Sequence, residues 1–175
     1  MIYYWLHIIF IYLGARFFWK KVDLAADLSR SRLVNLWDCD VRFMANSKYF
    51  YYMDFIRLEL LFRSKLYDNT IKKGMFPVLG SQKIIYKNPL KCWSKFTITL
   101  VLDGWDDKWV YHKQIFRCKG EIYAIGITKV TFWKNKKAQD IRKIIADSGM
   151  EKAEMPPSPE IMEMFNDDHE ILMRN

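Results

Sequence analysis

The stretch of residues 49–63 limits the fold more than any other part of the chain. Its side chains are apolar, and many are aromatic, on nearly every face that a helix would present. A helix that is hydrophobic all round has to be surrounded either by lipid or by the rest of the protein. Asp54 and Arg57, like Glu59 and Arg63, have the spacing of helical ion pairs, which argues against lipid. The pattern therefore predicts a central helix buried within the protein.

The neighbouring residues set the expected limits of this helix. We expect it to run over residues 48–67, with the side chain of Asn46 or Ser47 as its N-cap. Residues 22–31 are more polar and are interpreted as a short helix or linker, whereas residues 32–43 are interpreted as extended. A strand is thus expected before the helix.

Beyond residue 74 the hydrophobic pattern changes to the period of two that is typical of β-strands. Strand-like segments lie at residues 77–87, 95–102, 109–116 and 122–130. They predict an antiparallel meander of about four strands, followed by a short helix over residues 138–147. One curved sheet on one apolar helix is an α+β layer fold.

The N-terminal segment, residues 1–21, is interpreted separately. Residues 2–19 are apolar except for Arg16, and at 18 residues they reach the lower limit for crossing a bilayer. The basic residues Lys20 and Lys21 follow the apolar run, whereas a cleaved signal peptide has its basic residues before it. We therefore predict an uncleaved membrane anchor, with the following domain on the cytoplasmic side. A helix packed on the domain, or cleavage followed by secretion, are the alternatives.

The rest of the chain fits one domain over residues 22–149 and a proline-containing acidic tail over residues 150–175. At 51% hydrophobic residues the chain can bury a core, which a disordered chain cannot do. Cys39, Cys92 and Cys118 lack the spacing of metal ligands, so we expect reduced thiols and no metal. Sequence signatures of P-loop, dinucleotide-binding, zinc-protease and serine-hydrolase sites are absent.

The charge balance favours a partner that carries phosphate. With 28 basic and 20 acidic residues, the formal net charge is +8. Such a charge attracts nucleic acid, anionic lipid or a nucleotide-containing ligand. The basic residues are scattered and form no long basic arm, so we do not expect nucleic acid as the partner.

Four groups of residues carry a family resemblance, in the family's order and at similar spacing. They are Asp38-Cys-Asp40-Val with Met44-Ala-Asn46-Ser-Lys-Tyr49, Met53-Asp54-Phe-Ile-Arg57 with Leu61-Phe-Arg63-Ser64, Pro77-Val-Leu-Gly80-Ser81, and Gly104-Trp105-Asp106-Asp107-Lys108. Across residues 34–133 the chain resembles the hotdog-fold acyl-CoA thioesterases of the 4-hydroxybenzoyl-CoA thioesterase-like family. It is particularly similar to the thioesterase-superfamily-member-six proteins and their bacterial relatives.

The resemblance implies a single hotdog domain that hydrolyses an acyl thioester to a free acid and coenzyme A. Coenzyme A enters as part of the substrate, and no other cofactor is implied. By resemblance Asp40 is the nucleophile or the base that activates water, while Asn46, Tyr49 and Trp105 bind substrate. Backbone amides at the start of the central helix would stabilise the developing oxyanion. The family also implies a homodimer or a dimer of dimers, and a role in lipid metabolism at the endoplasmic reticulum or another endomembrane.

The chain departs from the family pattern just before the central helix. Only three residues separate Asp40 from Met44, one fewer than in the family, and the family histidine is missing there. A non-catalytic, membrane-associated hotdog module that binds acyl-CoA, lipid or protein partners is therefore the alternative. The candidate residues also have structural interpretations: a turn carboxylate for Asp40, an N-cap for Asn46 and a tight hairpin around Trp105. His112, on a strand with apolar neighbours, is interpreted as a satisfied core residue.

Overall fold

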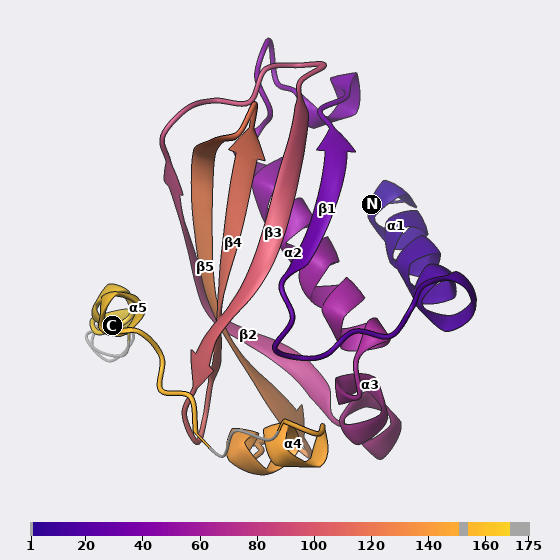
Figure 1. The fold of residues 1–175 in the computed structure, drawn as a ribbon, viewed down its shortest axis with the longest axis vertical. Coiled ribbons are helices and arrows are strands. Elements are labelled where there is room, and N and C mark those ends of the chain that lie inside the picture. The colour runs from indigo at the N-terminus through magenta and orange to yellow at the C-terminus, as the bar shows by residue number, and fades with distance from the viewer. Residues whose placement is uncertain (1, 151–153, 169–175) are drawn as a thin grey trace.

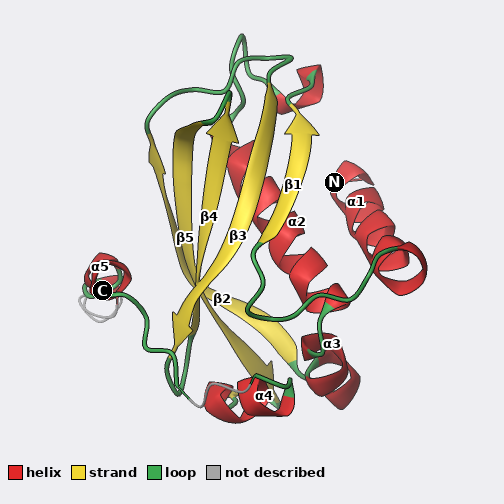
Figure 2. Ribbon diagram, in the orientation of Figure 1, coloured by secondary structure: helices red, strands yellow, loops and turns green. Residues whose placement is uncertain are grey.

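The computed structural model describes residues 2–150 and 154–168, in which an antiparallel sheet curls around one long helix (Figure 1). The helices are α1 (Ile2–Leu13), α2 (Asn46–Arg63), α3 (Leu66–Asn69), α4 (Ile141–Asp147) and α5 (Pro159–Met164). The strands are β1 (Leu28–Leu33), β2 (Phe76–Tyr86), β3 (Lys95–Trp105), β4 (Val110–Cys118), β5 (Glu121–Lys134) and β6 (Lys137–Ala138). Helices α1 and α2 lie on one side of the sheet and α5 on the other (Figure 2).

The strand order is β1-β3-β4-β5-β2, with β6 paired to β5. The predicted meander is confirmed for β3, β4 and β5, which are neighbours in chain order. It is wrong for β2, which pairs with β5 at the far side of the sheet. The interpretation of residues 22–31 as a helix or linker holds for residues 22–27, which form a linker, but is wrong for residues 28–31, because β1 begins at Leu28. Its polar side chains suit an edge strand with one exposed face, and for that reason the hydrophobic pattern did not indicate a strand there.

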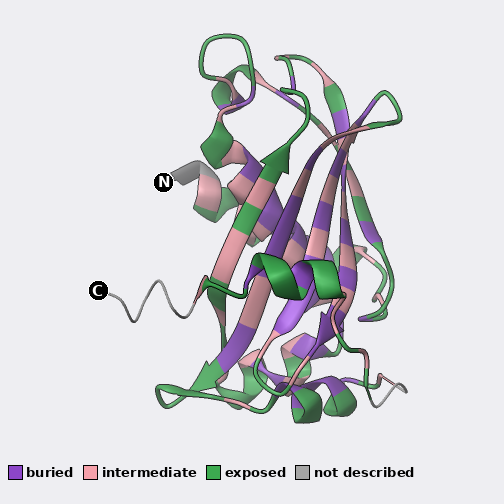
Figure 3. Ribbon diagram, turned by 90° about the vertical axis from the view of Figure 1, so that its left-hand side faces the viewer, coloured by how far each residue is buried: buried purple, intermediate pink, exposed green. Residues whose placement is uncertain are grey.

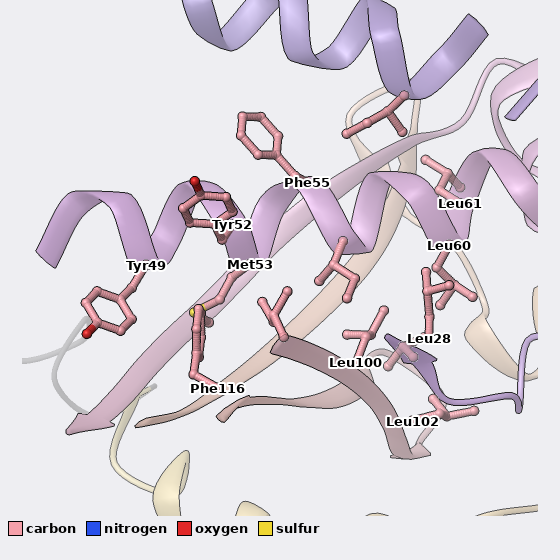
Figure 4. Packing of buried hydrophobic residues seen from close by; sticks show 14 of the residues in the cluster. Leu28, Tyr49, Tyr52, Met53, Phe55, Leu60, Leu61, Leu100, Leu102 and Phe116 are labelled. Atoms are coloured by element: carbon pink, nitrogen blue, oxygen red, sulfur yellow. The ribbon is translucent and has the colours of Figure 1, made fainter. Parts of the chain in front are cut away.

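Helix α2 is the buried central helix that the sequence predicts. It lies between α1 and the inner face of the sheet (Figure 4). Its buried side chains pack on inward-facing residues of β3 and β4, chiefly Phe96, Ile98, Leu100 and Phe116. Both predicted ion pairs are present, Asp54 with Arg57 and Glu59 with Arg63, and Glu59 also binds Arg30 of β1.

The ends of α2 differ from the expected limits. The N-cap is Ala45, so the prediction of a capping side chain at Asn46 or Ser47 is wrong. The backbone of Ala45 is instead held by its N–H bond to the carbonyl of Asp38, at 2.8 Å. At the other end α2 stops at Arg63, because Ser64 is extended and its Oγ accepts a bond from Leu66 N, 3.3 Å away.

Helix α1 runs beside α2 in the same direction. The rings of Tyr4 and Phe55 are 5.4 Å apart, and those of Tyr12 and Phe62 are 5.5 Å apart. Side chains of α1 that face away from α2 are apolar but exposed: Trp5, Leu6, Ile9, Phe10 and Leu13. No helix in the described part of the chain has the length and apolar character needed to cross a membrane.

Residues 154–168, which include α5, cross the outer face of the sheet (Figure 3). The carbonyl of Met155 accepts a hydrogen bond from Trp105 N at 2.8 Å. Gly104, with φ of +152°, lies directly beneath this crossing, and a Cβ there would be 2.4 Å from the Met155 oxygen. Ile161 and Phe165 then pack on outward-facing side chains of β4 and β5. The described part of the predicted tail thus covers this face of the sheet.

Candidate functional site

The two acids of the Asp-Cys-Asp motif lie just before α2 but in different surroundings. Asp38 is 1% exposed. One of its carboxylate oxygens accepts bonds from Tyr52 Oη at 2.8 Å and from Asn35 N at 3.2 Å. The other oxygen faces the Lys48 ammonium at 3.8 Å. Asp38 therefore ties the segment before α2 to the first two turns of the helix.

Asp40, the sequence-predicted catalytic residue, lies at the exposed tip of the next loop. The loop is tight, because Asp40 N donates to Phe43 O at 3.0 Å and Cys39 forms a β-bridge with Met44. A second bridge joins Phe43 to Lys91. The shortened loop is thus a well-defined turn that presents the Asp40 carboxylate to solvent.

Asn46 and Tyr49 come together at a hollow of about 230 Å³ beside the start of α2. Tyr86, Lys87, Asn88 and Pro89, at and just beyond the end of β2, form its other wall. Asn46 is exposed, whereas Tyr49 is 1% exposed and its hydroxyl accepts a bond from Leu90 N at 3.2 Å. Burial raises the pKa of Tyr49, so this hydroxyl stays protonated. The hollow offers polar contacts next to the Asp40 loop.

The structure does not bring Trp105 to this hollow. Trp105 is the last residue of β3, whereas Lys95, at the other end of that 11-residue strand, pairs with Leu33 near the segment that leads into α2. A strand of this length spans about 35 Å. Trp105 is 4% exposed and belongs to the core, and Asp106 Oδ1 accepts from Lys108 N at 2.8 Å to form the turn.

A larger cavity of about 280 Å³ lies between the second half of α2 and strands β2, β4 and β5. Its walls are mostly apolar and include Leu58 and Leu61 of α2, Leu79 of β2, and Val130 and Phe132 of β5. Tyr4 of α1 also lines it, so three layers of the structure meet there.

The polar side chains of this cavity gather around the middle of α2. The carboxylate of Asp54 is hydrogen-bonded to the guanidinium of Arg57. Burial raises the pKa of Asp54, and the Arg57 charge opposes that effect. His112 of β4 is 7% exposed, and burial, reinforced by the Arg57 charge, lowers its pKa to about 3. His112 is therefore neutral, with one ring nitrogen as donor and the other as acceptor.

The interpretation of His112 as a satisfied core residue is wrong, because neither ring nitrogen has a hydrogen-bond partner among the described residues. The sequence feature that could have indicated this is the position of His112 in the strand. Val110, His112, Gln114 and Phe116 share the inward face of β4, so a histidine and a glutamine interrupt an apolar row beneath α2. Polar residues at inward positions of a strand mark either a buried network or a ligand site.

In the described part of the chain, no group of three or more His, Cys, Asp or Glu side chains is arranged to hold a metal ion. Cys39 and Cys92 are half-buried free thiols, and Cys118 is a buried one.

One antiparallel sheet curled around a single helix, with an acidic loop at the helix start and an apolar cavity beneath the helix, defines a hotdog protein. The chain matches the thioesterase-like superfamily over residues 34–165, which contain both locations described above, and it belongs to that superfamily.

Relatives and solved structures agree with this assignment. "Protein THEM6" of Drosophila melanogaster is 24% identical over 172 residues, 96% of this chain and 86% of that protein. "Protein THEM6" of Xenopus laevis is 36% identical over 95 residues, 54% of this chain and 46% of that protein. The probable thioesterase YbaW of Escherichia coli superposes with a TM-score of 0.64 at 18% identity, covering 70% of this chain and 99% of that one. A 1,4-dihydroxy-2-naphthoyl-CoA thioesterase from Synechocystis shares the fold with a TM-score of 0.58 at 13% identity, covering 70% and 95%.

Proposed function

We propose that this protein is a thioester hydrolase that cleaves an acyl-CoA to a free acid and coenzyme A. The observation that carries the proposal is the match to the thioesterase-like superfamily over residues 34–165, which includes the acidic loop, the helix start and the cavity. A structural neighbour is named as a thioesterase of 1,4-dihydroxy-2-naphthoyl-CoA, and another is a Staphylococcus aureus protein in complex with CoA. These names favour coenzyme A as the thiol carrier.

In the proposed mechanism Asp40 acts at the thioester carbonyl, either as the base for a water molecule or as the nucleophile. With a water molecule, the water oxygen bonds to the carbonyl carbon while its proton passes to the Asp40 carboxylate. Amides in the first turn of α2 stabilise the negative oxygen, and the carbon–sulfur bond then breaks. The coenzyme A sulfur leaves and takes up a proton. Asn46 and Tyr49 would hold the substrate beside the helix start.

A homodimer joined along β2 is part of the proposal. Strand β2 is an 11-residue edge of the sheet, and its large apolar side chains at Phe76, Leu79, Ile85 and Tyr86 are all more than 40% exposed. An exposed apolar edge is a template for pairing with another strand. Pairing with the same edge of a second copy would cover it and would enclose the hollow at Asn46 and Tyr86.

We also propose attachment to an endomembrane, such as the endoplasmic reticulum, through the outer side of α1. Phe17 and Phe18, just after α1, are 68% and 83% exposed and extend its apolar outer side. Arg16, Lys20 and Lys21 lie beside them and would face lipid phosphates. The full-length protein should float with vesicles of phosphatidylcholine and phosphatidylserine. Replacing Phe17 and Phe18 by serine should reduce flotation severalfold, and unchanged flotation would contradict this attachment.

One observation favours the alternative of a non-catalytic module that binds acyl-CoA. The Asp40 side chain is exposed, and within the described part of the chain no hydrogen bond fixes its carboxylate. A carboxylate that is not positioned by its surroundings gains little as a base, since catalysis depends on geometry. A partner subunit would have to supply that positioning.

Turnover of acyl-CoA substrates by the full-length protein tests the proposal. Acyl-CoA loss should be followed by chromatography, because the protein's own thiols interfere with thiol reagents. Asp40→Asn should lower kcat/KM by about a hundredfold or more, the scale of general-base catalysis. Asp107→Asn, at an exposed turn beyond the end of β3 that lies away from the start of α2, is the matched control and should be fully active. Equal activity of Asp40→Asn and wild type would remove Asp40 from the mechanism, and tight binding without any turnover would favour the module.

A further inference from the structure

The cavity beneath α2 combines an apolar wall with polar groups that lack partners. A plain core would fill such a space with apolar side chains, and a buried polar network would satisfy its own members. Here neither holds. The wall is formed by leucines, valines and a phenylalanine, while His112 and one nitrogen of Arg57 are buried without hydrogen-bond partners among the described residues.

Each unpartnered group has a definite chemistry. Arg57 Nη1 can only donate, and the neutral His112 ring offers one donor and one acceptor. Asp54 adds acceptor oxygens beside them, although it is already bound to Arg57. Leaving such groups buried and unbonded costs about 1–3 kcal/mol each. A ligand atom that both accepts and donates a hydrogen bond would satisfy the set.

The ion pair also sets the charge of the ligand at this point. Asp54 and Arg57 neutralise each other, and His112 is neutral because its pKa is far below 7. A carboxylate or an ammonium group placed among them would meet one partner and one like charge in a buried site. A hydroxyl group is neutral, accepts from Arg57 or His112, and donates to the remaining His112 nitrogen or to Asp54.

We propose that this cavity binds a short or medium hydrocarbon chain that carries a hydroxyl group, such as a hydroxylated fatty acid. Arg57 lies eleven residues along α2 from Asn46, about 16 Å away, so this binding site is separate from the hollow beside the Asp40 loop. The apolar wall at Leu58, Leu61 and Phe132 receives the hydrocarbon, and Arg57 and His112 bond the hydroxyl oxygen. The volume of about 280 Å³ lies just below the range for small-molecule pockets, so the chain is of short or medium length.

Binding of free acids to the full-length protein tests the proposal without requiring turnover. Octanoate is compared with 2-, 3- and 8-hydroxyoctanoate by isothermal titration calorimetry. At least one hydroxy acid should bind ten- to a hundredfold more tightly than octanoate, the factor that one satisfied buried polar group supplies. The positional series shows where along the chain the hydroxyl meets His112.

Two variants distinguish the cavity from other binding surfaces. His112→Leu removes both ring nitrogens, so the preference for the hydroxy acid should fall below about threefold while octanoate still binds. Leu58→Trp fills the cavity and should abolish binding of both acids. Thermal unfolding of each variant establishes that it is folded; should Leu58→Trp unfold, Leu79→Phe at the opposite wall replaces it.

Several outcomes would overturn the inference. They are equal affinity for octanoate and all the hydroxy acids, no binding of any acid, an unchanged preference in His112→Leu, and binding unaffected by a filled cavity. The outcome is separable from that of the proposed function. Hydroxy-acid binding without any acyl-CoA turnover would contradict the proposed hydrolase function and leave the cavity as a binding site. Equal turnover of hydroxylated and plain acyl-CoA substrates, with no hydroxy-acid binding, would contradict the cavity assignment alone.

Discussion

Asp38 and Asp40 are separated by one residue, yet their side chains face opposite environments. Asp38 is buried and bonded to Tyr52 and to the backbone of Asn35, whereas Asp40 is exposed. Replacing Asp38 by alanine should lower the free energy of unfolding by about 2 kcal/mol or more, because hydrogen bonds to a buried charge are lost. Asp40→Ala should change it by less than about 0.5 kcal/mol. Urea unfolding of both variants checks this, and equal effects would contradict the division of roles.

His112 gives stability a pH dependence with a definite sign. Its pKa is lowered from 6.5 to about 3 in the folded protein. Between these values the unfolded chain takes up a proton that the folded protein excludes, so stability falls as the pH drops below about 6.5. From pH 7.5 to pH 5 the loss should be roughly 2 kcal/mol. His112→Leu should remove most of it. Urea unfolding at both pH values measures the difference, and a variant as pH-dependent as the wild type would refute the assignment.

At the residue scale, spacing in the sequence predicted pairs within one element but not contacts between elements. The ion pairs of Asp54 with Arg57 and of Glu59 with Arg63 follow from helical periodicity, and both form. The third partner of Glu59, Arg30 on β1, depends on which strand lies beside the helix. The lack of hydrogen-bond partners for His112 among the described residues could not be predicted from spacing for the same reason, since the groups around it come from α2 and from neighbouring strands.

At the scale of elements, the apolar outer side of α1 made the helical spacing of its inward-facing residues impossible to recognise in the sequence. Tyr4, Ile8, Ile11 and Ala15 recur at helical spacing and face α2, as an amphipathic helix would place them. The residues between them are apolar as well, so the sequence had no visible period and was interpreted as a membrane anchor. The packing on α2 was the stated alternative, and it describes the inner side of α1. Attachment of the outer side to a membrane stays a proposal.

Gly104 holds the segment that covers the outer face of the sheet. An added Cβ would meet the Met155 oxygen at 2.4 Å, and the φ of +152° is strained for any other residue. Gly104→Ala should therefore cost about 2 kcal/mol or more and detach residues 154–158. Gly120→Ala is the matched control, because Gly120 also has a positive φ, +85°, but open space around it, and it should cost only about 1 kcal/mol.

Limited proteolysis with mass spectrometry, run beside thermal unfolding, measures both effects. Cleavage near Met155 should become faster in Gly104→Ala only. Equal losses of stability in the two variants, with no new cleavage, would show that the close approach of Met155 does not limit the choice of residue at position 104.

At the scale of the whole molecule, the hotdog fold was predicted from one helix, period-two strands and the motif resemblance, and the family match agrees. The order of the strands could not be read from the local pattern. Period two shows which side chains share a face, but it does not specify the neighbouring strand. For the same reason, the separation of Trp105 from Asn46 could not be predicted. Both residues lie in the family motifs, and only the topology of the sheet shows that they are far apart.

The two edges of the sheet give opposite expectations for assembly. Ile85 on β2 and Leu33 on β1 have similar exposure, 53% and 49%. Strand β1 is short and carries serines and arginines, whereas β2 is long and apolar along its exposed side. If two copies pair along β2, a lysine at residue 85 puts a charge into the paired edge and removes apolar contact. A lysine at residue 33 lies on the opposite edge and has no such effect.

Analytical ultracentrifugation of the full-length protein over a range of concentrations provides the measurement. The wild type and Leu33→Lys should sediment as a dimer, and Ile85→Lys should weaken association by at least tenfold, since loss of about 1.4 kcal/mol suffices for that change. Acyl-CoA turnover should fall with the dimer fraction, because the partner would enclose the hollow at Asn46 and position the Asp40 carboxylate. A monomeric wild type, or dissociation by Leu33→Lys instead, would contradict pairing along β2. Full activity in monomeric Ile85→Lys would show that one chain carries out the whole reaction. Because no group within the described part of one chain positions the Asp40 carboxylate, the carboxylate of Asp54 in the cavity would then replace it as the candidate catalytic group.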